Sequence, residues 1–122
     1  MSAVLTGIAK KSFDAPDDTR IFPNARVEIV NLVGYTVSRS TLLPGWLWSR
    51  DVKPTVGTDW CEIEHTGYVA AGQLKVTLRD GTDVLLGPGD FAHIPPYHDA
   101  AVIGDVAVVL VDITGGIGWR KP

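Results

Sequence analysis

A short apolar strand between two turn signals is the most informative part of the sequence, and it lies in Gly87-Pro88-Gly89-Asp90-Phe91-Ala92-His93-Ile94-Pro95-Pro96-Tyr97-His98. Gly89-Asp90 is typical of a tight turn into a strand, because glycine adopts backbone angles that other residues avoid. Pro95-Pro96 ends the strand, since proline donates no backbone hydrogen bond to a sheet. The stretch therefore predicts one β-strand that is sharply bounded at both ends.

The rest of the chain repeats this pattern of apolar runs and turn signals. From Arg26 onward, β-branched, aromatic and other apolar residues come in short groups with polar residues between them. The dividing signals are Gly34, Pro44-Gly45, Gly57, Gly67, Gly72, Asp80-Gly81, Gly87-Pro88-Gly89, Pro95-Pro96 and Gly104-Asp105. Such spacing predicts an all-β sandwich or barrel. A closed barrel is favoured because it leaves no exposed strand edges.

Two hairpins are predicted from individual turns. Residues 74–78 alternate apolar and polar side chains, Asp80-Gly81 is typical of a type I′ turn, and residues 82–86 return. A second hairpin is expected to turn at Gly104-Asp105. The run that follows, 106–111, is apolar on both faces, like a strand buried between two sheets.

Length and charge limit the classes of function. The chain has 122 residues, which suits one globular domain, and its formal net charge is −3. It has no basic run for nucleic acid and no apolar run of the ~20 residues that a membrane span requires. Nothing near Met1 resembles a secretory signal, and a single cysteine, Cys61, allows no disulfide within the chain. We therefore expect a cytoplasmic protein with a small-molecule ligand and no nucleic-acid or membrane partner.

Two segments resemble the cupin superfamily, which has an RmlC-like jelly-roll fold. The stretch 87–98 resembles the cupin element P-G-D, apolar strand, I-P-P-G, His. Residues 61–72 resemble the element H-x-H, then Glu, then Y-V-L-x-G. The resemblance covers roughly residues 40–112 and implies a cupin double-stranded β-helix, a jelly-roll barrel with an N-terminal arm.

The resemblance also implies a domain organisation. Residues 1–25 would form an N-terminal arm or strap, residues 26–114 the barrel and residues 115–122 a C-terminal tail. In cupin-like domains such arms often lie across a neighbouring subunit, and a homodimer is the usual arrangement. We therefore expect a homodimer.

A closer resemblance is to small cupins that occur alone or fused to signalling enzymes such as adenylate cyclases. Their motifs are matched at 44–49, 53–54, 57–61, 65–69 and 94–101. Two positions depart from the pattern: Tyr97 stands where it has glycine, and Ala101 where it has tryptophan. If position 101 faces inward, the cavity is reshaped there, which suggests a bulkier or different ligand.

Metal ligands are the first candidate site residues. Cupins of the standard type hold a divalent metal with three histidines and one glutamate. Counted back from Gly72, His65 stands at the glutamate position, Cys61 at the second histidine and Asp59 at the first. On a strand these three residues share one face. His98 lies two residues before the position of the remaining histidine, hence also on the same face of a strand.

A site of Cys61, His65 and His98, completed by water or Asp59, would suit zinc, because thiolate and imidazole are borderline-soft ligands. Iron or nickel is the next choice. The sequence leaves a metal-free site open as well, since a lone buried cysteine is often a small core residue.

Catalytic and substrate-binding residues follow from the same cavity. His98 and His65 are the expected acid–base residues, with the hydroxyl of Tyr97 or Tyr68 nearby, because imidazole titrates near neutral pH. The sequence does not decide on which face of its strand His93 lies. Expected substrate contacts are Trp46 and Trp48 as an aromatic wall, Tyr68, Ala101, and Arg39 or Arg50 for a ligand carboxylate. The tryptophans could equally be core or dimer contacts.

These residues favour a small-molecule enzyme. The expected reaction is acid–base chemistry, metal-assisted or not, such as cyclisation, isomerisation, dehydration or decarboxylation of a carbonyl-bearing substrate, with a role in specialised biosynthesis. The first alternative is a non-catalytic sensor or binding cupin. The second is a metal-dependent dioxygenase, which the incomplete set of three histidines and one glutamate disfavours.

Overall fold

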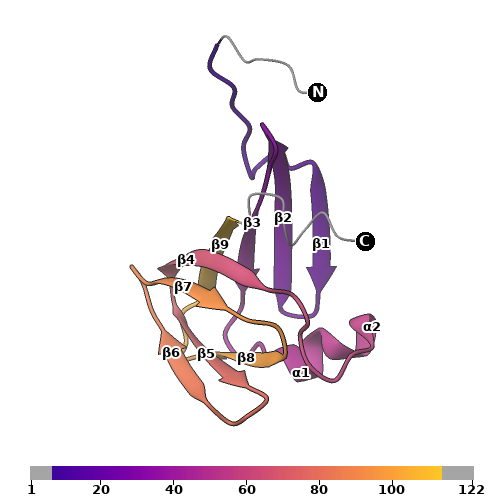
Figure 1. Ribbon diagram of the computed structural model, residues 1–122, viewed down its shortest axis with the longest axis vertical. Helices are drawn as coiled ribbons and strands as arrows, with labels where there is room; N and C mark the ends of the chain where they lie inside the picture. Colours follow the sequence, from indigo (N-terminus) through magenta and orange to yellow (C-terminus); the bar gives the residue numbers. More distant parts are fainter. Residues whose placement is uncertain (1–6, 114–122) are drawn as a thin grey trace.

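Two antiparallel β-sheets make up the computed structural model, which describes residues 7–113 (Figure 1). The larger sheet has six strands in the order β1-β2-β3-β9-β4-β7, and the smaller has three in the order β6-β5-β8. The strands are β1 (Asp18–Phe22), β2 (Ala25–Leu32), β3 (Tyr35–Leu42), β4 (His65–Ala71), β5 (Gln73–Leu78), β6 (Asp83–Leu86), β7 (Phe91–Ile94), β8 (His98–Ile103) and β9 (Val108–Ile113). The predicted all-β jelly-roll fold is confirmed.

The sheets are not closed into one barrel, which corrects the predicted closure. Strands β7 and β8 follow one another in the sequence, yet β7 pairs with β4 in the larger sheet and β8 with β5 in the smaller. Pro95-Pro96 lies between them and cannot continue a ladder of hydrogen bonds. Within residues 7–113 no strand belongs to both sheets.

The two predicted hairpins also differ from the structure. Strands β5 and β6 do form a hairpin, but Asp80 is not among the non-glycine residues with positive φ. In its loop, residues 79–82, Gly81 has φ 94° and its amide donates to the carbonyl of Leu78 over 2.9 Å. Strands β8 and β9 lie in different sheets, so Gly104-Asp105 joins two sheets and makes no hairpin.

Alternation along the strands decides which side chains enter the interior. On β8 the residues His98, Ala100 and Val102 are buried, so Ala101 belongs to the opposite face. On β9 the buried row is Val108, Leu110 and Asp112. Each row therefore places one polar side chain, His98 or Asp112, among apolar ones.

Two helices of four residues each precede β4, although the sequence shows no helical period. They are α1 (Trp48–Asp51) and α2 (Lys53–Val56), too short for a repeat of 3.6 residues to become visible. Pro54 suits the first turn of α2, and Gly57, at φ 81°, ends it. The helices lie at one end of the two sheets (Figure 1).

Asp51 stabilises this helical segment, and we expect its contribution to depend on pH. Hydrogen bonds from Arg50, Leu47 and Asn24 outweigh burial and lower the pKa of Asp51 from 3.8 to about 2. A lowered folded-state pKa means that the stabilisation is complete above about pH 4 and is lost as the pH falls toward 2. In urea unfolding, Asp51→Asn should therefore be about 1–2 kcal/mol less stable than wild type at neutral pH and nearly equal near pH 2. A difference that does not change with pH would contradict this.

Part of the segment predicted as an arm belongs to the larger sheet. Strand β1 pairs with β2, and residues just before it are held by ion pairs from Lys11 to Asp17, 2.9 Å, and from Arg39 to Asp14, 3.0 Å. Contact of the arm with a neighbouring subunit stays a prediction. The predicted tail, 115–122, lies outside the described residues.

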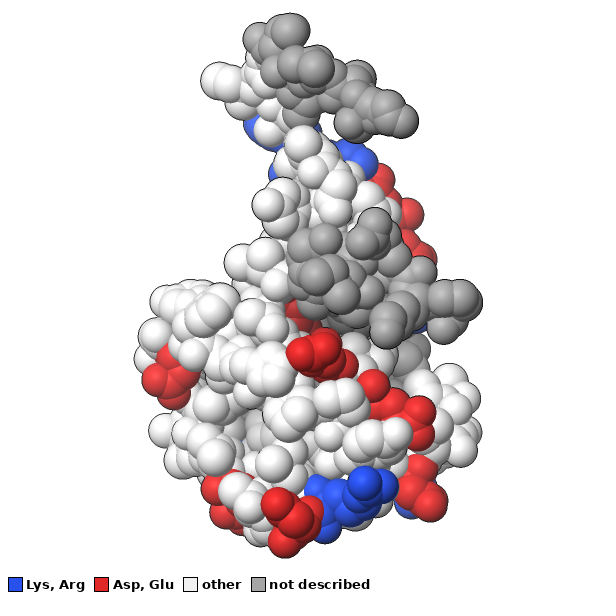
Figure 2. Space-filling view, viewed as in Figure 1, with Lys and Arg blue, Asp and Glu red and all other residues white. Residues whose placement is uncertain are grey.

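Charged side chains lie in small separate groups on the face shown in Figure 2, with uncharged residues between them. Among the described residues, no helix is both long and apolar enough to cross a membrane.

Candidate metal centre and pocket

A cavity of about 330 Å³ lies between the two sheets. Its walls are mostly apolar and come from both sheets and from the segment around α1. Trp46 and Trp48 are buried and line the cavity, as the predicted aromatic wall requires. Both tryptophans also belong to the hydrophobic core, so they are core residues and cavity-wall residues at the same time.

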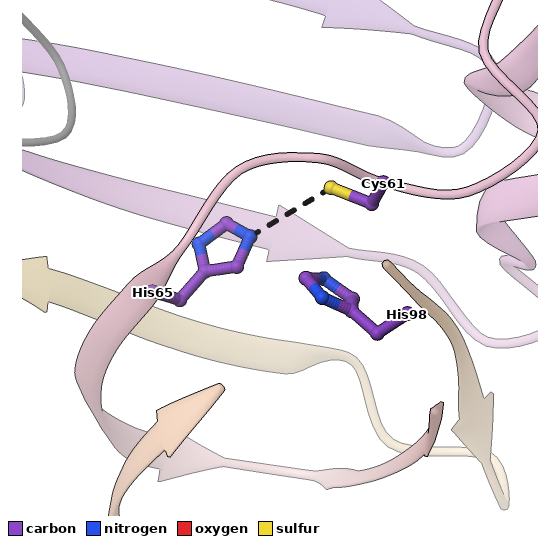
Figure 3. A group of neighbouring side chains, drawn as sticks. All are labelled: Cys61, His65 and His98. Atoms are coloured by element: carbon purple, nitrogen blue, oxygen red, sulfur yellow. Dashed lines mark hydrogen bonds between the residues drawn. The ribbon is translucent and has the colours of Figure 1, made fainter. Parts of the chain in front are cut away.

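Cys61, His65 and His98 meet at the wall of this cavity (Figure 3). One donor atom from each residue lies within 4.8 Å of the others. Cys61 Sγ is 4.0 Å from His65 Nε2, and the two imidazole rings have centroids 5.2 Å apart. The three side chains point toward one another from two parts of the chain, the segment 61–65 and the start of β8.

The backbone brings these residues together by a route that strand alternation does not predict. Residues 62–64 have no regular structure, and Cys61 forms an isolated bridge with His98. The Cys61 amide donates to the carbonyl of His98 over 2.9 Å, and the Tyr97 amide donates to the carbonyl of Cys61 over 2.7 Å. His65 enters as the first residue of β4. The predicted strand through residue 59 is therefore wrong, although the three residues do converge.

Hydrogen bonds fix the orientation of both imidazoles. His98 Nδ1 lies 2.7 Å from the carbonyl oxygen of Pro95, which can only accept, so Nδ1 carries the proton. His65 Nδ1 donates to Asp112 Oδ2 over 2.8 Å. Both rings thus keep Nε2 for a ligand, the usual arrangement of metal-binding histidines.

Asp112 was missed at the sequence level. It is fully buried on β9 and is the one charged residue in the otherwise apolar run 106–113. An acidic residue in such a run is a signal, because burying an unpaired carboxylate is costly. Gly67, its neighbour on β4, leaves the room it needs: a Cβ at Gly67 would come within 2.5 Å of Asp112 Oδ1.

The cluster shifts the titration of two of its members. Burial raises the pKa of the Cys61 thiol, but interactions with His65 and His98 outweigh it and lower the pKa from 9.0 to about 6. Burial lowers the pKa of His65, but Asp112 and Cys61 outweigh it and raise the pKa from 6.5 to about 10. At neutral pH the unliganded chain therefore has a Cys61 thiolate beside a protonated His65.

The donor set fits a divalent transition metal. It offers one thiolate and two imidazole nitrogens, with both rings held from behind by an acceptor. The cavity lies beside the donors, so a further coordination position could be filled by water or by a substrate.

Several predicted residues lie elsewhere, which corrects their assignment to the site. The Asp59 side chain is 88% exposed and lies 3.5 Å from Lys53 Nζ, so it is no fourth ligand. Tyr68 and Tyr97 are more than 40% exposed and do not line the cavity. Alternation turns Ala101 away from the interior.

Charged candidates are likewise bound to other partners. Arg39 pairs with Glu28 over 2.8 Å and with Asp14, outside the cavity. Arg50 forms two hydrogen bonds of 2.9 Å with the carboxylate of Asp51. His93, whose face was open, is exposed and lies 2.5 Å from Glu64.

Tyr97 acts on the cluster through its backbone. Its φ of 70° is left-handed, which explains why glycine would suit the position and costs a tyrosine about 1 kcal/mol. The ring is held by Arg79, whose guanidinium lies 4.4 Å from its centre.

We expect Tyr97→Gly to change the free energy of unfolding by less than about 1 kcal/mol, because relief of strain offsets the lost ring contact. Tyr97→Val should destabilise by about 1–3 kcal/mol, because a β-branched residue resists this φ. Urea unfolding of both variants measures the difference. Equal stability of the two variants would show that this backbone conformation is not retained in solution.

A family model described as a cupin domain matches residues 58–114, the segment that contains the cluster and Asp112. No curated protein sequence matches the chain. Three solved structures illustrate the similarity of fold. KdgF from Halomonas sp. is 22% identical, with a TM-score of 0.54 over 88% of this chain and 94% of that one. A cupin-like protein from Thermotoga maritima is 16% identical, with a TM-score of 0.54 over 80% and 72%.

The third is a chain from a study of the DMSP lyases RdDddP and RnDddQII. It is 18% identical, with a TM-score of 0.53 over 80% of this chain and 50% of that one. At identities of 16–22% these three similarities support the fold and assign no reaction to this chain.

Proposed function

We propose that this chain, whose residues 58–114 match a cupin domain and whose fold is similar to that of a cupin-like protein, is a small-molecule enzyme that moves protons next to a carbonyl group. The observation that carries the proposal is the convergence of Cys61, His65 and His98 at the wall of an apolar cavity. Cavities of this kind, with few polar groups on one side, are typical small-molecule sites.

Cys61 Sγ and the Nε2 atoms of His65 and His98 would hold a divalent metal. Zinc is favoured by the thiolate and imidazole donors, and iron or nickel is the alternative. A bound ion of this kind supplies Lewis-acid polarisation of a substrate carbonyl.

The chain's own residues orient the substrate and accept the proton. Asp112 and the carbonyl of Pro95 keep the two imidazoles in place, and the tryptophan walls exclude water. Glu62 also lines the cavity, is exposed and directly follows Cys61, which makes its carboxylate the candidate base of the metal-loaded chain. In a metal-free chain the Nε2 atom of His98 would take that role.

Isomerisation, dehydration and cyclisation can begin with removal of a proton next to the carbonyl, whereas decarboxylation loses CO2 and ends with delivery of a proton to that carbon, and the proposal covers all of them.

Exchange of hydrogen for deuterium tests the proposal without knowledge of the natural substrate. Zinc-loaded protein would be incubated in D2O with 4-phenyl-2-oxobutanoate or with neutral 4-phenylbutan-2-one, and deuterium next to the carbonyl counted by mass spectrometry. We expect exchange above the buffer rate for wild type and for His93→Ala, and none above it for His98→Ala. Binding of these probes without exchange would favour the sensor alternative, and oxygen consumption with bound iron would favour the dioxygenase.

The homodimer and the cytoplasmic location stay predictions. Sedimentation analysis of the purified chain would test the first, and fractionation of cells the second.

A further inference from the structure

We propose that the substrate of this cavity is a carboxylate with a compact apolar body, and that Arg20 binds its carboxylate group. The proposal rests on the proposed function, because it assigns the substrate class of the same cavity. Nothing in the sequence pattern points to Arg20, since it lies in the segment predicted as an arm.

The arginines first considered for this role are bound elsewhere. The guanidinium of Arg39 contacts Glu28 and Asp14 and lies over the ring of Phe13, 5.3 Å from its centre. Arg50 is held by Asp51 and by the carbonyl of Gly45, 2.6 Å away. Neither residue lines the cavity.

Arg20 is the one lysine or arginine among the cavity-lining residues that the structure describes. It lies on β1 opposite Val27 of β2, and Phe22, two residues on, shares its face and also lines the cavity. Its ion pair is with Asp18, 3.5 Å away, and both side chains are more than half exposed. Exposed pairs of this length are weak, so the guanidinium is available to a ligand anion.

The walls determine where an anion can lie. Phe22, Leu42, Trp46 and Trp48 surround the space with apolar surface, which disfavours an unpaired charge in the interior. A carboxylate is therefore stable beside Arg20, whose planar fork matches its two oxygens. The volume of about 330 Å³ is at the lower end for ligand pockets, which suits one ring and a short chain.

Arg20 on β1 and His65 on β4 lie on different strands of the larger sheet. Strands β1 and β4 are four steps apart in the order of the larger sheet, hence at most about 19 Å apart across the strands. The side chains of Arg20 and His65 both line the cavity, so their polar groups are closer together than the two strands are. A bound molecule would have its anionic end at Arg20 and its reacting carbon toward the cluster.

Calorimetric titration of the full chain, treated with a chelator, tests this assignment apart from any metal. The probes are phenylacetate, 3-phenylpropanoate and 4-phenylbutanoate, each paired with its neutral amide. The test variant is Arg20→Gln. The matched control is Arg26→Gln: Arg26 lies on β2, next to β1, and pairs with Glu28 of its own strand. Zinc content after reloading is measured on the same samples.

We expect the best carboxylate to bind wild type and Arg26→Gln about 10-fold more tightly than it binds Arg20→Gln. The amides should bind all three proteins equally. The inference is overturned if Arg20→Gln binds the carboxylates as well as wild type does, or if no carboxylate binds wild type better than its amide. Wild type that binds no zinc but keeps the Arg20-dependent preference would count against the proposed metal chemistry alone.

Discussion

Replacement of His98 by alanine is expected to lower the affinity for zinc by about 10³-fold. Zinc held by a few protein ligands has a binding free energy on the order of 12 kcal/mol, so each of three ligands contributes roughly 4 kcal/mol. His98 is also the ligand whose ring is fixed most simply, by a single hydrogen bond to the carbonyl of Pro95. Competition titration with a zinc chelator measures the affinity directly.

His93→Ala is the matched control, because His93 is exposed and bound to Glu64 outside the cluster. Its zinc affinity should equal that of wild type. His98→Gln keeps most of the buried volume and guards against misfolding of the alanine variant, and its thermal unfolding should stay near that of wild type. Undiminished zinc binding by folded His98→Gln would remove His98 from the site.

Asp112→Asn is expected to reduce zinc affinity by about 10- to 100-fold, although residue 112 does not touch the metal. The carboxylate accepts a hydrogen bond from His65 Nδ1 over 2.8 Å and thereby orients Nε2 toward Cys61. An amide of the same size accepts that bond less strongly, since it has no charge. The same chelator competition measures the loss.

Asp105→Asn is the control for this substitution, since Asp105 is exposed in the turn between β8 and β9. We expect no change in its zinc affinity. A direct role of Asp112 as a ligand would instead show as a loss as large as that of His98→Ala. An unchanged affinity in Asp112→Asn would mean that the ring of His65 is oriented by other contacts.

The sequence predicts the fold well where local chemistry decides it. Gly89-Asp90 and Pro95-Pro96 bound β7 at 91–94, as the turn signals require. The type I′ turn was expected at the wrong place: positive φ at both central residues occurs at Val33-Gly34, between β2 and β3. Valine rarely adopts a positive φ, so the sequence does not mark Val33 as a turn residue. The register of β2 with β3 imposes this conformation.

Residues brought together by sheet order are harder to predict. Cys61, His65 and His98 were found because family spacing and strand alternation both pointed to them, although the alternation fails at residues 62–64. Asp112 and Arg20 come from strands that lie beside the site only through the pairing of β9 with β4 and of β1 with β2. The pairing of β9 with β4 brings together His65 and Asp112, which are 47 residues apart in the sequence, and no local pattern records it.

X-ray absorption at the zinc edge of the reconstituted chain examines the three proposed ligands most directly. We expect one ion per chain with one sulfur neighbour at about 2.3 Å and two imidazole nitrogens at about 2.0–2.1 Å, and no sulfur neighbour in Cys61→Ser. A spectrum without sulfur in the wild-type chain, or a chain that takes up no ion, would contradict the metal centre.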